Sequence, residues 1–337
     1  MKLALKITPQ RSTQYANMAA TLAAPELLAS PLSAAISEFM PTRLAGQGYL
    51  LVTIDEAHLL ASTRLNVLAR LGATSEAYEY FEQIGEVQGP LLRPLEPQFT
   101  PFVPLGMAEA RRYRGKTNEI FTRILLNVAL FAGNYGEQYE ERLRILDPLA
   151  GGGTTLFLAL ASGYDAFGIE LERQDVETTA VFVRQYLESE RMPYKEVDER
   201  GRKAGRRYQF EIGYKEKKRV FVLAHGDARD AALHMREVVG GPHMHAIVGD
   251  LPYGIQHFGE IATLLSKALP IWEQMLLPGG TLALAWNATR IERTAMIELI
   301  ERCTHLRVRN DPPYTQFEHA VDRVIKKRDI VVAVQAL

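Results

Sequence analysis

The sequence predicts an α/β protein whose mostly parallel sheet carries a ligand site at a glycine-rich turn. The apolar run Leu143–Leu146 has the length and composition of a buried strand, and Leu156–Ala161 has those of a helix with an apolar face. Between them lies the turn Asp147-Pro-Leu-Ala-Gly-Gly-Gly-Thr-Thr155. Further strand-like and helix-like runs alternate from there to Asp329–Val334, and such alternation is typical of parallel sheets.

The turn has the features of a site for a nucleoside-containing cofactor. A strand, a glycine turn and a helix N-terminus present free backbone N–H groups, and glycines let the backbone approach a ligand closely. The next strand, Ala166–Ile169, ends on Glu170, where an acid can accept hydrogen bonds from a ribose diol. The turn is not G-x-G-x-x-G, and the carboxylate of Asp147 at its start favours a cofactor with a cationic amino-acid tail, S-adenosylmethionine, over NAD. An ordinary strand-to-helix turn is the alternative.

The stretch 147–155 resembles the D-P-F-x-G-S-G-T-T cofactor motif of class I methyltransferases that act on exocyclic amino groups. The resemblance covers roughly residues 110–337 and implies a Rossmann-like fold with a seven-stranded, mostly parallel sheet. It implies S-adenosylmethionine as cofactor and S-adenosylhomocysteine as product, with Asp227 accepting a hydrogen bond from the adenine amino group. The cofactor-binding residues that it implies are Asp147, Pro148, Ala150, Gly151, Gly153, Thr154, Glu170, Asp227, Ala228 and Asp250.

A second motif, Asp250-Leu-Pro-Tyr-Gly254, follows the predicted strand His245–Gly249. It is similar to the D/N-P-P-Y/F catalytic motif of the same enzymes, in which a carboxylate and a backbone carbonyl accept the two N–H bonds of a conjugated amine. A tyrosine face holds the base flat by stacking. Asp250, Pro252 and Tyr253 are therefore the implied catalytic residues. Leu251 in place of the first proline is most like the THUMP-associated methyltransferases that modify guanine in tRNA.

The literal signature Asp311-Pro-Pro-Tyr314 lies further on, and we interpret it as a turn. In the unpermuted order of the fold the catalytic motif follows the fourth strand, whereas residues 311–314 precede the last one. Prolines after an aspartate are common turn formers.

Residues 191–219 hold eleven basic and five acidic side chains, a net charge of +6, with four aromatic residues interleaved. Lysine and arginine neutralise phosphates and aromatic faces stack on unpaired bases, so we expect a nucleic-acid contact that includes Arg202, Lys203, Arg206 and Arg207. The alternative is a solvated hairpin. This connection begins at the end of the sheet away from the cofactor, so it must fold back to reach a substrate there.

Residues 1–105 are predicted to form a small α+β domain that ends in a proline-rich linker, and residues 106–337 the methyltransferase domain. The predicted strands are Leu3–Thr8, Tyr49–Ile54 and Ala77–Ile84, and the predicted helices are Gln14–Ala24, Leu32–Phe39 and Glu56–Leu71. Prolines at positions 90, 94, 97, 101 and 104 define the linker. THUMP-type enzymes carry two small N-terminal modules, whereas this region has space for about one and shows no THUMP motif.

The basic run Arg111–Lys116 precedes a predicted helix, Glu119–Phe131, with Thr117 or Asn118 as its cap. In the resembling enzymes a helix here packs beside the methionine end of the cofactor. Lys116, Thr117 and Asn118 are therefore candidates for the pocket wall, and a capped helix with a solvated basic start is the alternative.

Composition sets the remaining limits. The net charge of the 337 residues is −1, so contact with nucleic acid must come from local patches. Cys303 is the only cysteine, which excludes internal disulfides, and no metal-ligand cluster is seen. Without a run of the ~20 apolar residues that a membrane span needs, we expect a cytoplasmic protein.

The expected function is methylation of an exocyclic amino group of a nucleobase, with guanine in RNA, most of all tRNA, as the leading substrate. Three alternatives stay open: a DNA adenine or cytosine amino-methyltransferase, a protein glutamine methyltransferase, and a nucleotide-binding protein without activity. The oligomeric state is not predicted.

Overall fold

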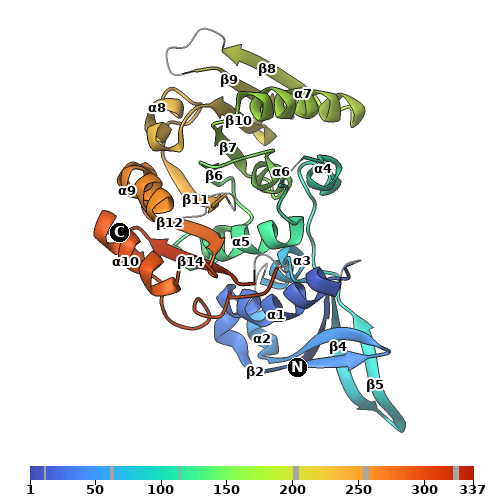
Figure 1. The fold of residues 1–337 in the computed structure, drawn as a ribbon. Helices are drawn as coiled ribbons and strands as arrows, with labels where there is room; N and C mark the ends of the chain where they lie inside the picture. Colours follow the sequence, from blue (N-terminus) through green and yellow to red (C-terminus); the bar gives the residue numbers. More distant parts are fainter. Residues whose placement is uncertain (11–12, 61–63, 114, 200–204, 253–257, 322–325) are drawn as a thin grey trace. The chain divides into compact units, whose positions relative to one another are not determined.

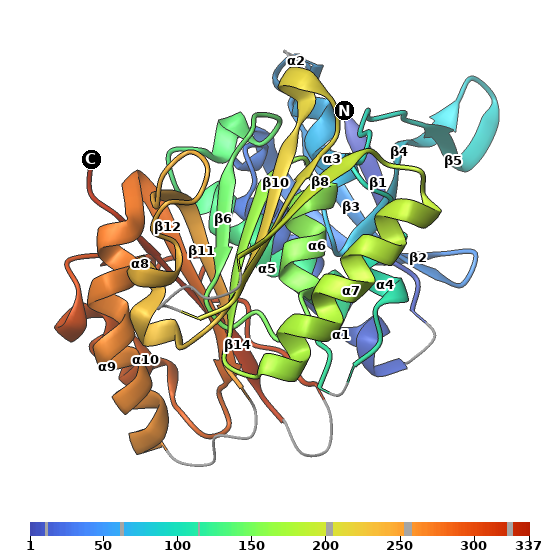
Figure 2. The same ribbon diagram turned by 90° about the horizontal axis from the view of Figure 1, so that it is seen from above.

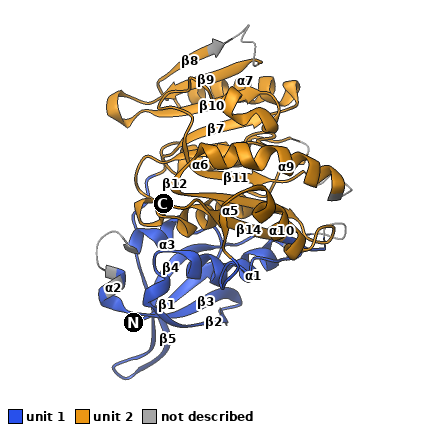
Figure 3. Cartoon of the chain, turned by 90° about the vertical axis from the view of Figure 1, so that its left-hand side faces the viewer, with its two compact units in different colours: residues 1–100, 310–328 blue, residues 101–309, 329–337 orange. Residues whose placement is uncertain are grey.

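The computed structural model describes residues 1–337 except 11–12, 61–63, 114, 200–204, 253–257 and 322–325 (Figure 1). The chain forms two compact units, residues 1–100 with 310–328 and residues 101–309 with 329–337 (Figure 3). The sequence placed residues 106–337 in one domain, whereas the segment 310–328 packs with the first unit.

The first unit is built on a five-stranded antiparallel sheet in the order β2-β3-β1-β4-β5. Its strands are β1 Lys2–Ile7, β2 Ile36–Leu44, β3 Gln47–Ile54, β4 Thr74–Ile84 and β5 Val87–Pro94. Its helices are α1 Thr13–Ala29, η1 Ser33–Ala35, α2 Glu56–Leu60, η2 Arg64–Asn66 and α3 Val67–Arg70. Strand β1 lies in the middle of the sheet, and its residues Leu3, Ala4 and Leu5 are all buried, whereas Lys2 at its start is exposed.

Three predictions for this unit are wrong, each because tertiary packing outweighs local propensity. Helix α1 continues through Pro25, since Leu22 and Leu27 on either side of it are fully buried. The predicted helix 32–39 becomes strand β2 from Ile36 onward, paired with β3. The first two linker prolines, Pro90 and Pro94, belong to β5, an edge strand in which a missing N–H is tolerated.

The second unit contains a nine-stranded sheet in the order β13-β14-β12-β11-β6-β7-β10-β9-β8. Its strands are β6 Arg144–Asp147, β7 Asp165–Glu170, β8 Tyr194–Glu199, β9 Arg207–Ile212, β10 Arg219–His225, β11 Met244–Asp250, β12 Leu276–Asn287, β13 Arg307–Val308 and β14 Arg328–Val334. Its helices are α4 Gly106–Ala110, α5 Glu119–Ala132, η3 Gly136–Gln138, α6 Thr154–Ala161, α7 Arg173–Ser189, η4 Lys215–Lys217, η5 Ala228–Asp230, α8 Ala231–His234, α9 Phe258–Met275 and α10 Arg293–Cys303. Helices α5, α6 and α7 cover one face of the sheet and α8, α9 and α10 the other (Figure 2).

The order of the strands fixes where a ligand can bind. From β6 the chain moves outward through β7 to β10, then returns to the other side of β6 with β11 and β12. The four pairings among β10, β7, β6, β11 and β12 are parallel. The carboxyl ends of β6 and β11 therefore flank the point where the order reverses, and open parallel sheets bind their ligands at such a point. The α/β fold and the mostly parallel Rossmann-like sheet are as predicted.

The basic segment 191–219 adds two antiparallel strands, so the sheet has nine strands instead of the seven that were predicted. Strand β9 pairs with β10 from Arg219↔Ile212 to Ala224↔Arg207. Arg207 pairs with Ala224, near the carboxyl end of β10. The hairpin therefore reaches the carboxyl ends of the parallel strands, where the amide of His225 donates to the carbonyl of Arg206 at 2.8 Å.

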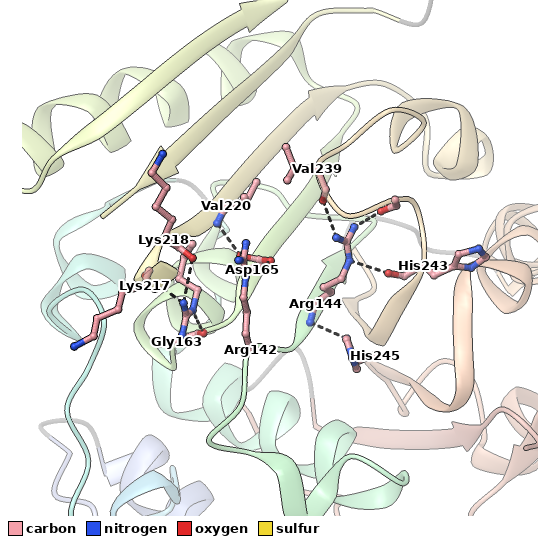
Figure 4. A network of polar contacts seen from close by, with 12 residues as sticks. Arg142, Arg144, Gly163, Asp165, Lys217, Lys218, Val220, Val239, His243 and His245 are labelled. Atoms are coloured by element: carbon pink, nitrogen blue, oxygen red, sulfur yellow. Dashed lines mark hydrogen bonds and ion pairs between the residues drawn. The ribbon is translucent and has the colours of Figure 1, made fainter. Parts of the chain in front are cut away.

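At the amino ends of the strands a polar network surrounds two arginines, Arg142 and Arg144 (Figure 4). The Nε of Arg144 donates to the carbonyl of His243 at 2.9 Å, and its backbone amide donates to Nδ1 of His245 at 3.0 Å. Asp165 joins β7 to β10 by accepting from the amide of Val220 at 2.7 Å and from Nε of Arg142 at 2.9 Å. These contacts hold the amino ends of the strands in register.

Candidate functional site

A pocket of about 990 Å³ opens at the carboxyl edge of the large sheet. Its floor comes from the last residue of β6 (Asp147), the last of β7 (Glu170), the residues after β10 (Gly226 and Asp227) and the last of β11 (Asp250). Nine of the ten predicted cofactor residues line it: Asp147, Pro148, Ala150, Gly151, Thr154, Glu170, Asp227, Ala228 and Asp250. The tenth, Gly153, lies behind the wall as the left-handed cap of α6, with φ of 91°.

Asp147 is a buried carboxyl group at the start of the glycine-rich turn, only 2% exposed. The amide of Leu149 donates to its Oδ1 at 2.9 Å. Burial raises the pKa of Asp147 from 3.8 to about 7; the charges of Asp250 and Glu170 add to the rise, and hydrogen bonds from Thr155 and Leu149 oppose it. A ligand that brings a positive charge to this carboxylate would offset the cost of its burial.

Two glycines of the turn are favoured for different reasons, Gly151 by its backbone conformation and Gly152 by the space around it. Gly151 has φ of 51°, a left-handed conformation that favours glycine, and its amide donates to Oε2 of Glu170 at 2.7 Å. A Cβ on Gly152 would lie 2.4 Å from the ring of Tyr113. The turn is therefore held between a carboxylate on one side and an aromatic ring on the other.

Two acids at the ends of the next strands lie where the sequence predicted them. Glu170 accepts from the amides of Gly151 and Glu172, both at 2.7 Å, which leaves further lone pairs on each oxygen. Asp227 caps η5 by accepting from the amide of Arg229 at 2.8 Å, and it forms an ion pair with the same arginine. The hydrogen bond from Arg229 lowers the pKa of Asp227, so this side chain is a carboxylate.

The motif at the end of β11 contributes to the same pocket. Asp250, Leu251 and Pro252 all line it, and Leu251 is buried. The hydroxyl of Thr117 donates to Oδ2 of Asp250 at 2.6 Å. The predicted stacking residue, Tyr253, lies outside the described residues.

The pocket wall opposite the strands comes from the segment before α5. Asn118 is the helix cap, with its side chain accepting from the amide of Phe121 at 3.1 Å. Of the three candidates before this helix, Thr117 lines the pocket, whereas Lys116 pairs with Glu119 and donates to the carbonyl of Glu109 at 3.2 Å.

Tyr113 was not predicted as a site residue. Its hydroxyl lies 2.8 Å from Oγ1 of Thr154, and its ring lines the pocket. Burial raises the pKa of Tyr113, so the phenol stays neutral. A single aromatic residue inside a basic run was the only signal in the sequence, and Arg111 stacks on that ring at 5.9 Å.

The pocket is strongly acidic. Among its described lining residues, seven have carboxyl groups and one, Arg229, carries a positive charge. The acids are Asp147, Glu170, Glu172, Asp175, Asp227, Asp250 and Glu260. A cationic or neutral ligand fits this lining, and a pyrophosphate would meet uncompensated repulsion.

The structure describes two of the four side chains that were predicted to contact nucleic acid, Arg206 and Arg207. Arg207 is a correction: it is 2% exposed, and its guanidinium donates to the carbonyls of His234 at 3.2 Å and Arg236 at 2.8 Å, so it cannot reach a phosphate. Arg206 is partly exposed and pairs with Glu177 at 3.1 Å. Arg202 and Lys203 lie outside the described residues.

The aromatic residues of the same segment mostly serve the core. Tyr208 and Phe210 are buried, and Phe210 packs edge-on against Phe221 with centroids 6.0 Å apart. Tyr214 is 72% exposed, and Tyr194 contacts Phe210 at 6.0 Å. Tyr208 and Phe210 lie on β9, a strand that is buried along almost its whole length.

The sequence Asp311-Pro-Pro-Tyr314 belongs to the first unit. The amide of Tyr314 donates to the carbonyl of Asp311 at 2.8 Å, which closes a turn, and the Tyr314 ring is buried. Neither residue lines the pocket.

The described part of the chain contains no group of three or more histidine, cysteine, aspartate or glutamate side chains that could hold a metal ion. No helix within it is long and apolar enough to cross a membrane.

No family model and no curated protein matches the sequence. Among solved structures, TrmN from Thermus thermophilus is 18% identical, with a TM-score of 0.41, over 68% of this chain and 52% of that one, so this chain spans about half of its length. A methyltransferase from Pyrococcus furiosus is 15% identical over 67% of this chain and 88% of that one, with a TM-score of 0.38. An rRNA methylase from Streptococcus thermophilus is 12% identical over 67% of this chain and 100% of that one, with a TM-score of 0.36. Likenesses this weak carry no conclusion about activity, cofactor or substrate.

Proposed function

We propose that this protein is an S-adenosylmethionine-dependent methyltransferase that acts on an exocyclic amino group of a nucleobase, with guanine in tRNA or another RNA as the substrate. One observation supports this above all. The carboxylate of Asp250 and the cradle formed by Asp147 and Gly151 line a single pocket at the point where the strand order reverses. An acceptor amine and a cofactor can therefore meet there.

The residues present fit the cofactor. The ammonium group of its methionine end would find the buried carboxylate of Asp147, whose pKa is raised by burial and by the neighbouring carboxylates of Asp250 and Glu170, so that a cation there would be stabilising. Glu170, at the end of β7, would accept from the ribose hydroxyls, and Asp227, at the end of the next strand, from the adenine amine. The acidic lining disfavours NAD, which carries a pyrophosphate, and thereby supports the choice between the two cofactors.

For methyl transfer the protein mainly has to align the acceptor amine with the methyl group and to exclude water. When bound, S-adenosylmethionine supplies an electrophilic methyl group. Asp250 accepts one N–H of the acceptor amine, which keeps the nitrogen lone pair directed into the pocket. Pro252 belongs to the backbone that would accept the second N–H, and Tyr253 is the proposed stacking surface for the base. The volume of about 990 Å³ lies at the upper end of the roughly 300–1,000 Å³ of small-molecule sites, enough for a cofactor and a base together.

The basic hairpin supports RNA as the substrate. Its fold-back puts Arg206 at the carboxyl edge of the sheet, the edge at which the pocket opens. Arg202 and Lys203 precede Arg206 by three or four positions in the sequence, on the other side of Gly205. A polyanion drawn to this end of the sheet would present its bases near the acidic pocket, while its phosphates stay at the basic hairpin.

The proposal is tested first by binding and then by transfer. Calorimetry should show S-adenosylmethionine and S-adenosylhomocysteine binding and NAD not binding. Mass spectrometry of tRNA nucleosides from cells with and without the gene should show one methylated guanosine that depends on it. Asp250→Ala should bind the cofactor and fail to restore the modification.

A loss of adenine, cytosine or glutamine methylation in cells without the gene would give the protein one of the alternative substrates. Tight binding of NAD alone would refute the proposal as a whole.

The hairpin has its own test. Neutralising Arg202, Lys203 and Arg206 together should weaken RNA binding and reduce its salt dependence by at most about three phosphate contacts. An unchanged salt slope would assign this segment to solubility.

A further inference from the structure

The carboxylate of Asp250 does its proposed work only if it is held in one orientation. An aspartate side chain turns about two bonds, and each oxygen can face the pocket or the wall. One of these oxygens, Oδ2, accepts a hydrogen bond from the hydroxyl of Thr117 at 2.6 Å. The two residues are 133 positions apart in the chain, and the contact is partly buried.

Thr117 is itself fixed. It lies directly before Asn118, which caps α5 through its side chain and whose carbonyl accepts from the amide of Thr122 at 3.0 Å. Helix α5 is buried along most of its length, so its first turn is a rigid support. A hydroxyl on such a support can direct a carboxylate as a hydroxyl on a mobile loop cannot.

The same segment is anchored at its other end to the cofactor side of the pocket. Tyr113 lies 2.8 Å from Oγ1 of Thr154 at the start of α6, and its ring covers Gly152. Residues on both sides of position 114 therefore line one wall, which touches the glycine-rich turn through Tyr113 and the end of β11 through Thr117.

We infer that Thr117 is a positioning residue for methyl transfer: by donating to Oδ2 it holds the Asp250 carboxylate in the orientation that receives the acceptor amine. This inference rests on the proposed function. Threonine is branched at Cβ, which restricts the rotation of its side chain about χ1. The hydroxyl donor is therefore preorganised, as well as the carboxylate that it binds. Removing the hydroxyl leaves the carboxylate in place and takes away this donor to Oδ2.

The matched variants are Thr117→Val, which replaces the hydroxyl with a methyl group, and Thr117→Ser, which keeps it. Thr304→Val is the control, because Thr304 is a threonine that also donates its hydroxyl, to the carbonyl of Ile300 at 2.8 Å, and it lies outside the pocket. With tRNA from cells that lack the gene as substrate, Thr117→Val should lower kcat roughly tenfold to a hundredfold and leave the affinity for S-adenosylmethionine unchanged. Thr117→Ser should restore most of the loss, and Thr304→Val should show none.

A second readout does not depend on turnover. The carbon-13 resonance of the Asp250 carboxyl group in the protein without ligands, assigned by its loss in Asp250→Asn, should move in Thr117→Val and return in Thr117→Ser. If Thr117→Val does not fold, Thr117→Ala removes the same hydroxyl without adding bulk and takes its place.

The outcomes separate the two claims. If Asp250→Ala is inactive while Thr117→Val matches the wild type in kcat and resonance, the inference fails and the proposed function stands. Equal losses in the valine and serine variants with an unmoved resonance would make Thr117 merely structural and overturn the inference. If the wild type transfers no methyl group to any nucleic acid or protein, the proposed function fails, and the resonance alone still decides whether Thr117 holds Asp250.

Discussion

The buried carboxyl group of Asp147 predicts an unusual pH dependence of stability for the unliganded protein. Its pKa is about 7 in the folded chain against an ordinary value of 3.8. Between these values the folded state holds a proton that the unfolded state has released. The free energy of unfolding should therefore be highest below about pH 4 as far as this group is concerned, and should fall as the pH rises towards 7.

The size of the effect follows from the shift. A difference of roughly three pKa units, at about 1.4 kcal/mol each, gives an upper limit of about 4 kcal/mol lost between pH 4 and pH 8. This is a large part of the roughly 5–15 kcal/mol that stabilises a typical protein. Asp147→Asn removes the charge and keeps an acceptor for the amide of Leu149. The variant should be the more stable protein at pH 8, and its advantage should shrink steadily as the pH falls towards 3.8, the ordinary pKa of the group.

Both tryptophans of the chain make the measurement specific for the second unit. Trp272 and Trp286 are buried there, and the sequence has no others. Urea titrations followed by tryptophan fluorescence from pH 4.5 to 8.5 therefore report the unfolding of the unit that holds Asp147. The difference between variant and wild type, taken at each pH, is the quantity to compare.

Other titrating groups contribute equally to the free energy of unfolding of both proteins, so their contributions cancel in that difference. Burial lowers the pKa of His245, and the charge of Arg144 lowers it further, so His245 contributes stability that is lost as the pH falls below about 6.5. Asp227, with its lowered pKa, acts only below about pH 4. Parallel pH profiles for the wild type and Asp147→Asn would refute the account of Asp147 given above. The same reasoning predicts that S-adenosylmethionine binding near pH 6 releases close to one proton in the wild type and none in Asp147→Asn, as measured by calorimetry in buffers of different ionisation enthalpy.

Three further predictions concern the pocket and its surroundings. Gly152→Ala places a Cβ against the ring of Tyr113, so its affinity for S-adenosylmethionine should fall about tenfold and recover in part when Tyr113→Ala is added, both measured by calorimetry. Arg207→Ala should leave RNA affinity unchanged and destabilise the second unit by roughly 1–3 kcal/mol in urea titration, because the carbonyls of His234 and Arg236 lose their donor; weaker RNA binding by a fully stable variant would contradict this. Asp311→Ala should retain methyl transfer and Asp250→Ala should lose it, and the reverse pattern in the same assay would mean that the catalytic motif has been misassigned.

The part of the pocket around the glycine-rich turn was predictable as structure because it is local in sequence. Strand β6, the glycine turn and α6 form within residues 144–161, and the acid at the end of β7 follows at a separation that the fold itself sets. Asp250 was found for a similar reason, since a strand end followed by a proline turn leaves a side chain at the edge of the sheet.

The rest of the site depends on contacts between distant segments. The bond between Thr117 and Asp250 spans 133 residues, and Tyr113 reaches Thr154 over 41. Arg207 was misassigned because its charge is visible in the sequence, whereas the two carbonyls that bind it become neighbours only in the folded sheet. At these positions the residue type alone does not indicate which distant residue it will contact.

The division of the chain has a consequence for the order in which the protein can be made. The first unit is completed only by residues 310–328, and the second only by β14, which follows immediately and lies between β12 and β13 in the sheet. A ribosome that has translated three hundred residues has therefore finished neither unit. Both must wait for the same short stretch of chain, so their folding during synthesis is tied to one late event. A nascent chain stalled before that stretch would expose the unfilled edge of β12 as a strand-binding surface, a natural target for chaperones.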